Sequence, residues 1–338
     1  MTSASNPILS VRGLTTEFHG DRGHVRVLDD VSFDVGRGKI VGLVGESGSG
    51  KSMTALSLMG LVPQPQGRVT ARSILLDGTD ISRLGAAGMR SIQGRDIAMV
   101  FQEPMTSLNP VRWVWEQVGE PLAIHKGLGR SAIRARVLEM FELVGIPEPQ
   151  ARLDAYPHQL SGGLRQRAMI AMGLICEPKL LIADEPTTAL DVTTQAQILK
   201  LMRDLRDRVG TSIIMITHDL GIIAEMCDEV NVMYAGQMIE QADVFQLFEQ
   251  PAHPYTRGLL ASIPRVTEAR AARRMPSIPG MVPNLAKLPP GCRFSPRCDQ
   301  VMPVCRQAAP DLAAVAEAHV ARCWLHTAQS ALPQEETP

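Results

Sequence analysis

The sequence lacks the features that would place the chain in a membrane or on a secretory route. No apolar run approaches the ~18 residues needed to span a bilayer. One of the longest, Ala168 to Cys176, has the length of a core helix. The first residues, MTSASNPILSVRG, contain no basic region followed by an apolar one, so we find no secretory signal. We therefore expect a soluble, cytoplasmic protein that would act at a membrane only through partners.

An excess of charge is also missing. The 34 Lys and Arg residues are matched by 35 Asp and Glu residues, and the formal net charge is −1. This balance offers no whole-chain attraction for nucleic acid or anionic lipid, so we expect no nucleic-acid partner. The chain has 338 residues and 45% hydrophobic content, which suits one large domain and a small one, or two medium domains.

The most informative stretch is GESGSGKS, which matches the phosphate-binding pattern G-x-x-x-x-G-K-[ST]. An apolar, strand-like run from Ile40 to Val44 precedes it, and a helix-compatible run from Ser52 to Leu61 follows. Glycines let backbone N–H groups converge on one anion, and the next helix points its positive end there. A chance match has odds on the order of one per cent. The residues expected to bind ATP are Gly45, Glu46, Ser47, Gly48, Ser49, Gly50, Lys51 (β- and γ-phosphates) and Ser52 (Mg²⁺).

The pattern along the chain predicts an α/β fold with a mainly parallel sheet, because strand-like and helix-like runs alternate in its second half. From about 111 to 152, apolar residues recur at spacings of three and four, which predicts an inserted helical subdomain. The strand-like runs are 8–12, 25–35, 73–76, 96–101, 179–183, 211–216 and 229–234, and the later helical runs are about 191–209 and 219–226.

The domain organisation follows from this pattern. We expect an ATP-binding domain over 5–265 with its helical subdomain at about 103–165, a small Cys-rich extension over 266–328, and a disordered tail over 329–338. Five prolines fall within fifteen residues of the extension, which is typical of a linker or an extended wrap.

Polar residues follow three further strand-like runs. Asp184 ends the run LLIAD, where a carboxylate meets the nucleotide edge of an open α/β sheet and could hold Mg²⁺. Its neighbour Glu185 is the expected general base for a water that attacks the γ-phosphate. His218 is expected to touch that phosphate, and Gln102 to sense Mg²⁺ or the water; for each, a plain surface or loop residue is the alternative.

A second anion-binding signal occurs in LSGGLRQR, residues 160–167, where Ser161, Gly162 and Gly163 begin a helix. One nucleotide does not need two such cradles on one chain. Two chains that face each other head to tail would use both, with each Ser-Gly-Gly segment closing over the ATP of its partner.

This ordered set of motifs resembles the ATPase subunits of ABC transporters, over roughly residues 8 to 265. The resemblance implies a P-loop NTPase fold with N-terminal antiparallel strands and an ATP-sandwich dimer. Phe18 would stack on adenine, and Asp191 would contribute to the contact across the dimer. Gln102 and the helical subdomain would receive a membrane partner. Leu164 stands where the family pattern has Gln, which leaves the Ser-Gly-Gly backbone intact.

The C-terminal segments HPYTRGLLASIPR (253–265) and IPGMVPNLAKLPPGCRFSPRC (278–298) resemble the extension of oligopeptide, dipeptide and nickel uptake ATPases. That family implies a second ATPase subunit, identical or paralogous, two membrane permeases and an external substrate-binding protein, at the cytoplasmic face of a bacterial inner membrane. Peptide is the default cargo; nickel, glutathione, opines and sugars are alternatives. A soluble ABC ATPase of translation or repair is the runner-up, although the chain lacks the second ATPase module or long coiled-coil insertion usual there.

Four of the six cysteines fall within a short stretch: Cys292, Cys298, Cys305 and Cys323, separated by five, six and seventeen residues. Four thiolates are enough for an iron–sulfur cluster or for zinc. Zinc sites favour pairs two to four residues apart, and some members of the resembled family carry a [4Fe–4S] cluster here. We expect such a cluster in a structural role, with Zn²⁺, disulfides or idle thiols as alternatives.

Overall fold

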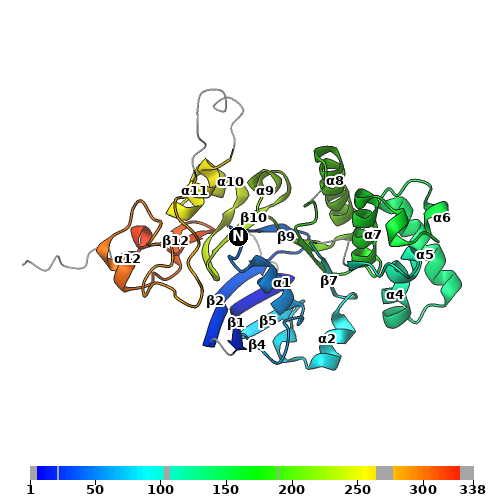
Figure 1. Ribbon diagram of the computed structural model, residues 1–338, viewed down its shortest axis with the longest axis horizontal. Coiled ribbons are helices and arrows are strands. Elements are labelled where there is room, and N and C mark those ends of the chain that lie inside the picture. The colour runs from blue at the N-terminus through cyan, green and yellow to red at the C-terminus, as the bar shows by residue number, and fades with distance from the viewer. Residues whose placement is uncertain (1–5, 21–22, 103–106, 189, 264–276, 328–338) are drawn as a thin grey trace, which may run out of the picture.

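The computed structural model of the chain describes residues 6–20, 23–102, 107–188, 190–263 and 277–327 (Figure 1). It confirms the predicted α/β fold: a large, mainly parallel sheet, an antiparallel sheet beside it, and a group of helices at one end. Within the described residues, no helix has both the length and the apolar character needed to cross a bilayer.

The large sheet has the strand order β12-β13-β11-β10-β3-β9-β8-β7. The five strands from β10 to β7 are parallel. At the other edge, β11 pairs antiparallel with β10, β13 with β11, and β12 with β13. The strands are β3 (Ile40–Val44), β7 (Ile97–Val100), β8 (Leu180–Asp184), β9 (Ser212–Ile216), β10 (Glu229–Tyr234), β11 (Gln237–Asp243), β12 (Ala313–Ala316) and β13 (His319–Ala321).

The central strand β3 shows why its sequence is apolar throughout. Ile40 and Val44 face a core shared with the helices on one side of the sheet, whereas Val41 and Leu43 face a second core on the other side. A parallel strand covered on both faces needs apolar residues at every position, because neither face meets water. The loop that follows β3 is therefore anchored at a fully buried strand end.

The second sheet is antiparallel, with the order β2-β1-β5-β6 and β4 paired to β1. Helix α1 lies between the two sheets and contributes Ala55 and Leu58 to the core that they share (Figure 1). The elements here are β1 (Leu9–Gly20), β2 (Gly23–Val35), α1 (Lys51–Leu58), β4 (Gly67–Thr70), β5 (Ser73–Leu76), β6 (Thr79–Asp80), the 3-10 turn Ile81–Arg83 and α2 (Ala86–Ile92).

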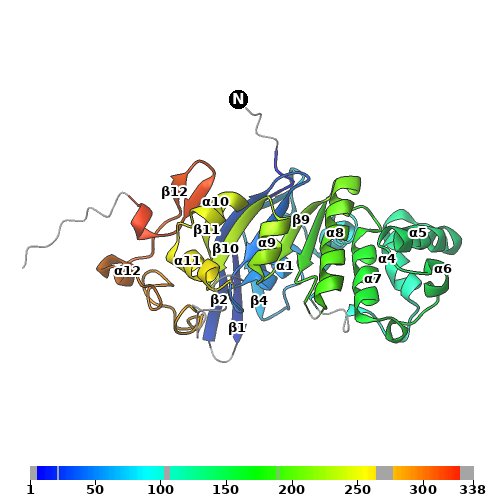
Figure 2. The same ribbon diagram turned by 90° about the horizontal axis from the view of Figure 1, so that it is seen from above.

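The predicted helical subdomain lies at the end of the molecule beyond β7 (Figure 2). Its core consists of apolar residues from α4, α5 and α7, including Val118, Val137 and Phe141, which are fully buried. The elements are α4 (Val114–Lys126), α5 (Arg130–Leu143), α6 (Pro149–Arg152), the 3-10 turn Pro157–Gln159 and α7 (Gly162–Leu174). The remaining face of the large sheet is covered by α8 (Val192–Val209), α9 (Leu220–Met226), α10 (Val244–Glu249) and α11 (Pro254–Ala261).

The described part of the C-terminal extension, 277–327, packs onto the ATPase core. Its strands β13 and β12 continue the large sheet beyond β11, and α12 (Pro303–Gln307) and a last 3-10 turn (Trp324–His326) complete it. The carboxylate of Glu240 on β11 is fully buried; it lies 2.8 Å from His319 Nε2 and accepts from the backbone N–H of Ala252 and of His253. The contact between His319 and Glu240 therefore joins the extension to the core.

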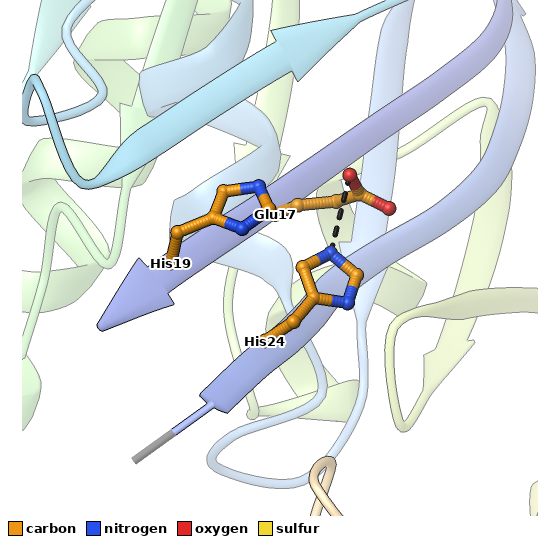
Figure 3. Close-up of side chains that lie close together, drawn as sticks. All are labelled: Glu17, His19 and His24. Carbon is orange, nitrogen blue, oxygen red and sulfur yellow. Dashed lines mark ion pairs between the residues drawn. The ribbon is translucent and has the colours of Figure 1, made fainter. Parts of the chain in front are cut away.

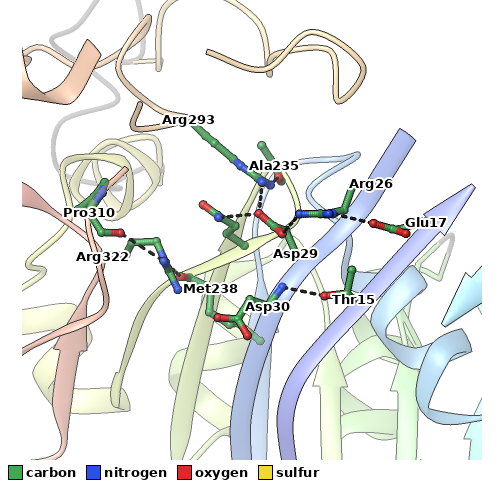
Figure 4. A network of polar contacts seen from close by, with 11 residues as sticks. Thr15, Glu17, Arg26, Asp29, Asp30, Ala235, Met238, Arg293, Pro310 and Arg322 are labelled. Atoms are coloured by element: carbon green, nitrogen blue, oxygen red, sulfur yellow. Dashed lines mark hydrogen bonds and ion pairs between the residues drawn. The ribbon is translucent and has the colours of Figure 1, made fainter. Parts of the chain in front are cut away.

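A second contact of the extension is made by Arg293, which reaches Asp29 of β2 and the carbonyl of Ala235 (Figure 4). Asp29 also accepts from Arg26, at 2.9 Å. The predicted domain boundary near 265 and the predicted disordered tail over 329–338 both lie outside the described residues, so they remain predictions.

Candidate functional site

The phosphate-binding loop leaves β3 at Gly45 and enters α1 at Lys51. Gly45 has φ 153° and Gly50 has φ 108°, backbone conformations that L side chains rarely adopt. A Cβ at Gly45 would lie 2.3 Å from the carbonyl oxygen of Met233 on β10, because the loop passes directly over that strand. The glycines therefore allow both the curl of the loop and its close approach to the sheet.

Lys51 lies inside the curl of this loop. Its ammonium donates to the carbonyl oxygens of Gly45, at 2.7 Å, and Glu46, at 3.1 Å. Burial lowers the pKa of Lys51, and the nearby carboxylates of Glu185, Asp184 and Glu46 partly offset that effect. A buried cation with carbonyl partners at the start of a helix is well placed to move onto a phosphate.

Asp184 ends β8 and lies beside the loop. Its Oδ1 accepts a hydrogen bond from the Ser52 hydroxyl at 3.2 Å, so two oxygen ligands converge at the start of α1. Such an oxygen pair fits Mg²⁺, which prefers hard oxygen ligands. Burial raises the pKa of Asp184, and the Ser52 hydrogen bond acts in the opposite direction.

Replacing Asp184 by asparagine is expected to stabilise the protein at pH 7 when no nucleotide is added. A carboxyl whose pKa is raised by folding binds its proton more tightly in the folded chain, so its contribution to stability falls as pH rises through that range. The neutral amide removes this cost, and each 1 kcal/mol regained raises the melting temperature by about 2–4 °C.

The measurement is thermal unfolding of both proteins from pH 7 downward. The difference should shrink as the pH falls, because the parent carboxyl then becomes neutral too. A variant that melts below the parent protein at pH 7 would contradict this account.

Glu185 is surrounded by three polar side chains. Gln102 Nε2 donates to Oε2 at 3.0 Å, the Thr188 hydroxyl donates to the same oxygen at 2.8 Å, and His218 Nδ1 lies 3.0 Å from Oε1. Burial favours the neutral acid, but the interactions with His218 and Thr188 outweigh it, so the pKa of Glu185 lies below its ordinary value. The carboxylate is thus held ionised and in one orientation.

Part of the loop, from Ser47 to Ser52, shares one cavity of about 350 Å³ with Gln102, Glu185 and His218. Three residues that sequence reasoning missed also line it: Val27, Met53 and Leu285. Thr188 was missed as a partner of Glu185, although a hydroxyl three residues beyond a candidate base is a visible signal. Nothing local in the sequence marks Leu285, which comes from the C-terminal extension.

Phe18 is not among the residues that line this cavity. It lies on β1 opposite Val25 and Gly67, and its ring packs close to Gly67. The apolar contacts available to a ligand in the cavity are those of Val27, Met53 and Leu285. The stacking role given to Phe18 therefore remains a prediction.

The second anion-binding segment lies apart from this cavity. Ser161 caps α7, its hydroxyl accepting from the Leu164 N–H at 3.4 Å, and Ser161 and Gly162 are exposed. Asp191 caps α8 and binds Thr194, whose methyl group lies beside Gly163. The starts of α7 and α8 are thus neighbours, and none of Ser161, Gly162, Gly163 and Asp191 lines the cavity of this chain.

Two family models match the chain. A model described as ABC transporter matches residues 28–188, and one described as Oligopeptide/dipeptide transporter, C-terminal region matches residues 239–305. The first contains the phosphate-binding loop, Ser161 and Glu185. The second begins on β11 and includes Arg293 and Arg297 of the extension, but it ends before β13.

Curated relatives match over nearly the whole chain. A probable peptide ABC transporter ATP-binding protein, y4tR, of Sinorhizobium fredii is 49% identical over 96% of this chain and 98% of the relative. The dipeptide transport ATP-binding protein DppD of Bacillus subtilis is 49% identical over 94% of each chain, and the oligopeptide transport ATP-binding protein AppD of that organism is 47% identical. The family resemblance found in the sequence is thereby confirmed.

The prediction of a [4Fe–4S] cluster is wrong. The matching descriptions are those of ordinary ABC transporter ATP-binding proteins and include no such cluster. Burial raises the pKa of Cys292 to about 11 and also raises the pKa values of Cys298 and Cys323, so these thiols are neutral at pH 7 when no metal is bound.

The zinc alternative gains no support either. Across the described residues, the only group of three or more candidate ligands with ligand atoms within 4.8 Å of one another is Glu17, His19 and His24 on the β1–β2 hairpin (Figure 3). There the carboxylate of Glu17 is already shared between His24, at 3.2 Å, and Arg26, at 2.9 Å. The cysteines lie close in sequence without bringing three thiols to this spacing.

Solved structures of ABC cassettes share the fold. The dimeric post-hydrolysis state of the cassette MJ0796 bound to ADP and Pi has a TM-score of 0.63 at 26% identity, over 70% of this chain and 98% of that chain. The cbiO1 subunit from Clostridium perfringens, part of a cbiONQ transporter complex, has a TM-score of 0.60 at 31% identity, over 73% of this chain and 92% of that chain.

The chain is an ATPase and belongs to the ABC transporter ATP-binding proteins that carry the oligopeptide/dipeptide transporter C-terminal region.

Proposed function

We propose that this chain powers a bacterial importer for di- or oligopeptides by binding and hydrolysing ATP. The observation that carries the proposal is one cavity lined by Lys51, Ser52 and a hydrogen-bonded Glu185, with Asp184 bound to Ser52, in a chain with the peptide-type C-terminal region. Relatives at 47–49% identity are named for dipeptide, oligopeptide or peptide transport.

The residues divide the chemistry among them. The loop amides and Lys51 bind the phosphates. Ser52 and Asp184, with Gln102 nearby, would hold a Mg²⁺ ion, which would neutralise phosphate charge. Glu185 accepts a proton from the water that attacks the γ-phosphate, while its contacts with Gln102, Thr188 and His218 fix the direction of its lone pairs. His218 is exposed, with 64% of its side chain accessible, so it can turn toward a γ-phosphate.

Each site is completed by a second ATPase subunit, identical or paralogous. Ser161, Gly162, Gly163 and Asp191 lie outside the cavity of their own chain, and the exposed start of α7 offers N–H groups to an anion. A neighbouring subunit in head-to-tail orientation would bring this segment over the γ-phosphate. The related cassettes MJ0796 and cbiO1 are described as a dimer and as part of a transporter complex.

The remaining partners are two membrane permeases and, through them, an external substrate-binding protein. The chain then works as a peripheral subunit on the cytoplasmic side of the inner membrane. The helical subdomain presents exposed apolar side chains, among them Val111 and Ile124, which suit contact with a permease loop. ATP binding closes the two subunits and moves the permeases, and hydrolysis reopens them.

Transport tests this proposal. The chain is reconstituted in vesicles with the permeases, the second ATPase subunit and the binding protein encoded beside it. We expect ATP-dependent uptake of a labelled dipeptide or tetrapeptide, falling to background with Lys51→Ala, because the ammonium can no longer reach the phosphates.

Two other outcomes would redirect the assignment. Uptake of labelled nickel, glutathione, an opine or a sugar with no peptide uptake would replace the cargo. Failure to assemble with any permease, with ATPase activity intact, would favour a soluble ABC ATPase.

A further inference from the structure

The second residue of the phosphate-binding loop, Glu46, is held from outside the loop by the C-terminal extension. Arg297 Nη1 lies 2.6 Å from one carboxylate oxygen of Glu46, and Nη2 lies 2.9 Å from the other. This is a fork-to-fork ion pair, the geometry in which Arg binds a carboxylate most firmly. The Arg297 side chain is 4% exposed and that of Glu46 30%, so water reaches the pair only from the side of the carboxylate.

Arg297 is itself fixed by its surroundings. Its Nε donates to the carbonyl of Pro279 at 2.9 Å, and its guanidinium carbon lies 5.8 Å from the centre of the Tyr234 ring. Lysine at this position would keep the charge, but it could supply neither the planar fork nor all of these contacts at once. Pro279 and Tyr234 therefore fix the orientation of the guanidinium, and the ion pair in turn fixes the position of the Glu46 carboxylate.

The backbone of Glu46 is held by a hydrogen bond to a second residue outside the loop. Its N–H donates to the hydroxyl of Tyr255 on α11 at 2.8 Å, and the Tyr255 side chain is fully buried. His253 caps α11 by accepting from the Tyr255 N–H at 3.0 Å. Burial lowers the pKa of His253 to about 3, so the ring stays neutral and its Nδ1 remains an acceptor. The segment 253–255 (HPY) thus fixes the start of α11 so that the Tyr255 hydroxyl reaches the loop.

These contacts converge on Glu46, which precedes Ser47, the first loop residue that lines the cavity. Lys51 binds the carbonyl of Glu46, so the residue gripped by Arg297 and Tyr255 is also a partner of the phosphate-binding lysine. The extension in addition contributes Leu285 to the wall of the same cavity. A loop whose amides are already in place loses less freedom when a ligand binds, and affinity rises accordingly.

We propose that Arg297 is a positioning residue for ATP, and that the C-terminal extension completes the nucleotide site by clamping the loop through Glu46. The inference rests on the proposed function, because it needs the loop to bind phosphates. It assigns to the extension a direct part in nucleotide affinity. An ion pair that only attached the extension to the core would affect stability and leave affinity unchanged.

The test measures ATP and ADP dissociation constants, steady-state kinetics and melting temperature for Arg297→Lys and Arg297→Gln in the full chain. Both variants are expected to bind ATP and ADP about tenfold more weakly, as for a lost charge-assisted contact. KM should rise in parallel, and kcat at saturation should stay within about twofold, because Glu185 and its partners are untouched. Arg297→Lys retains the charge, so its loss of affinity reports the geometry of the fork.

The matched control is Arg322→Gln. Arg322 also lies in the extension, where it donates to the carbonyls of Met238 and Pro310 and makes no contact with the loop (Figure 4). This variant should lower the melting temperature and leave the ATP dissociation constant unchanged. The double variant Arg297→Gln with Glu46→Gln should bind ATP no more weakly than Arg297→Gln alone. Both substitutions break the same ion pair, so their effects should not add.

The results separate two failures. If the parent protein does not bind ATP, the proposed function fails. If the parent binds ATP and Arg297→Lys binds it equally tightly, the clamp is overturned while the ATPase assignment stands. The clamp is likewise overturned if Arg297→Gln and Arg322→Gln lose stability alike and both keep parental affinity.

Discussion

Replacing Glu185 by glutamine is expected to lower ATP turnover by about 10²–10⁴-fold, the usual contribution of a general base. Glutamine keeps the size of the side chain and can still contact Gln102, Thr188 and His218, so the cavity keeps its shape. It cannot accept a proton from the attacking water. Binding of ATP should persist, and the ATP-bound dimer should accumulate because reopening requires hydrolysis.

The measurements are phosphate release, ATP binding, and the fraction of dimer seen by size-exclusion chromatography with ATP and Mg²⁺. The control is Thr188→Val, which removes one hydrogen bond to the same carboxylate and leaves the base in place. It should slow turnover by less than about tenfold, in line with one lost hydrogen bond. Parental turnover in Glu185→Gln would show that another group accepts the proton.

Replacing Gly45 by alanine is expected to destabilise the protein by about 3 kcal/mol or more and to abolish ATP binding. The new Cβ would lie 2.3 Å from the Met233 carbonyl oxygen and 2.8 Å from Ser49 Oγ. The first of these is backbone in the buried strand β10, so the loop has to move instead. Movement of the loop displaces the amides that would bind the phosphates.

Gly48→Ala provides the comparison within the same loop. Gly48 has φ 79°, and a Cβ there would meet nothing within 4 Å. This variant therefore carries only the cost of a left-handed alanine, about 1–2 kcal/mol. Denaturant unfolding measures the free energy of unfolding of both variants, and titration with ATP measures their affinity for the nucleotide. Equal losses in the two would mean that the contact with β10 is unimportant.

Local patterns in the sequence were sufficient to place the loop, Asp184, Glu185 and His218 at the same edge of the sheet. The phosphate-binding loop, Asp184, Glu185 and His218 each follow a buried strand, and the carboxyl ends of parallel strands meet at one edge of the sheet. Their convergence was predictable because apolar runs in the sequence indicate buried strands, and alternation with helices indicates that these strands are parallel. Helices α4 and α5 were predictable for the same reason, from the spacing of apolar residues along about 111–152.

The cysteines show where such reasoning fails. Cys292, Cys298, Cys305 and Cys323 line one small pocket, but no three of their Sγ atoms lie within 4.8 Å of one another. The relatives are ordinary ATP-binding subunits. Spacing along the chain determines neither the distances between the thiols nor the group that they bind.

The sequence by itself determined the fold class, the phosphate-binding loop and the family, because these depend on short motifs and on the periodicity of apolar residues. Only the tertiary structure decided how the C-terminal extension is used: β13 joins the core sheet, Leu285 reaches the nucleotide cavity and Arg297 grips Glu46. Those contacts join residues up to 251 positions apart. Partners that distant are chosen by the packing of the whole chain, and no local pattern encodes them.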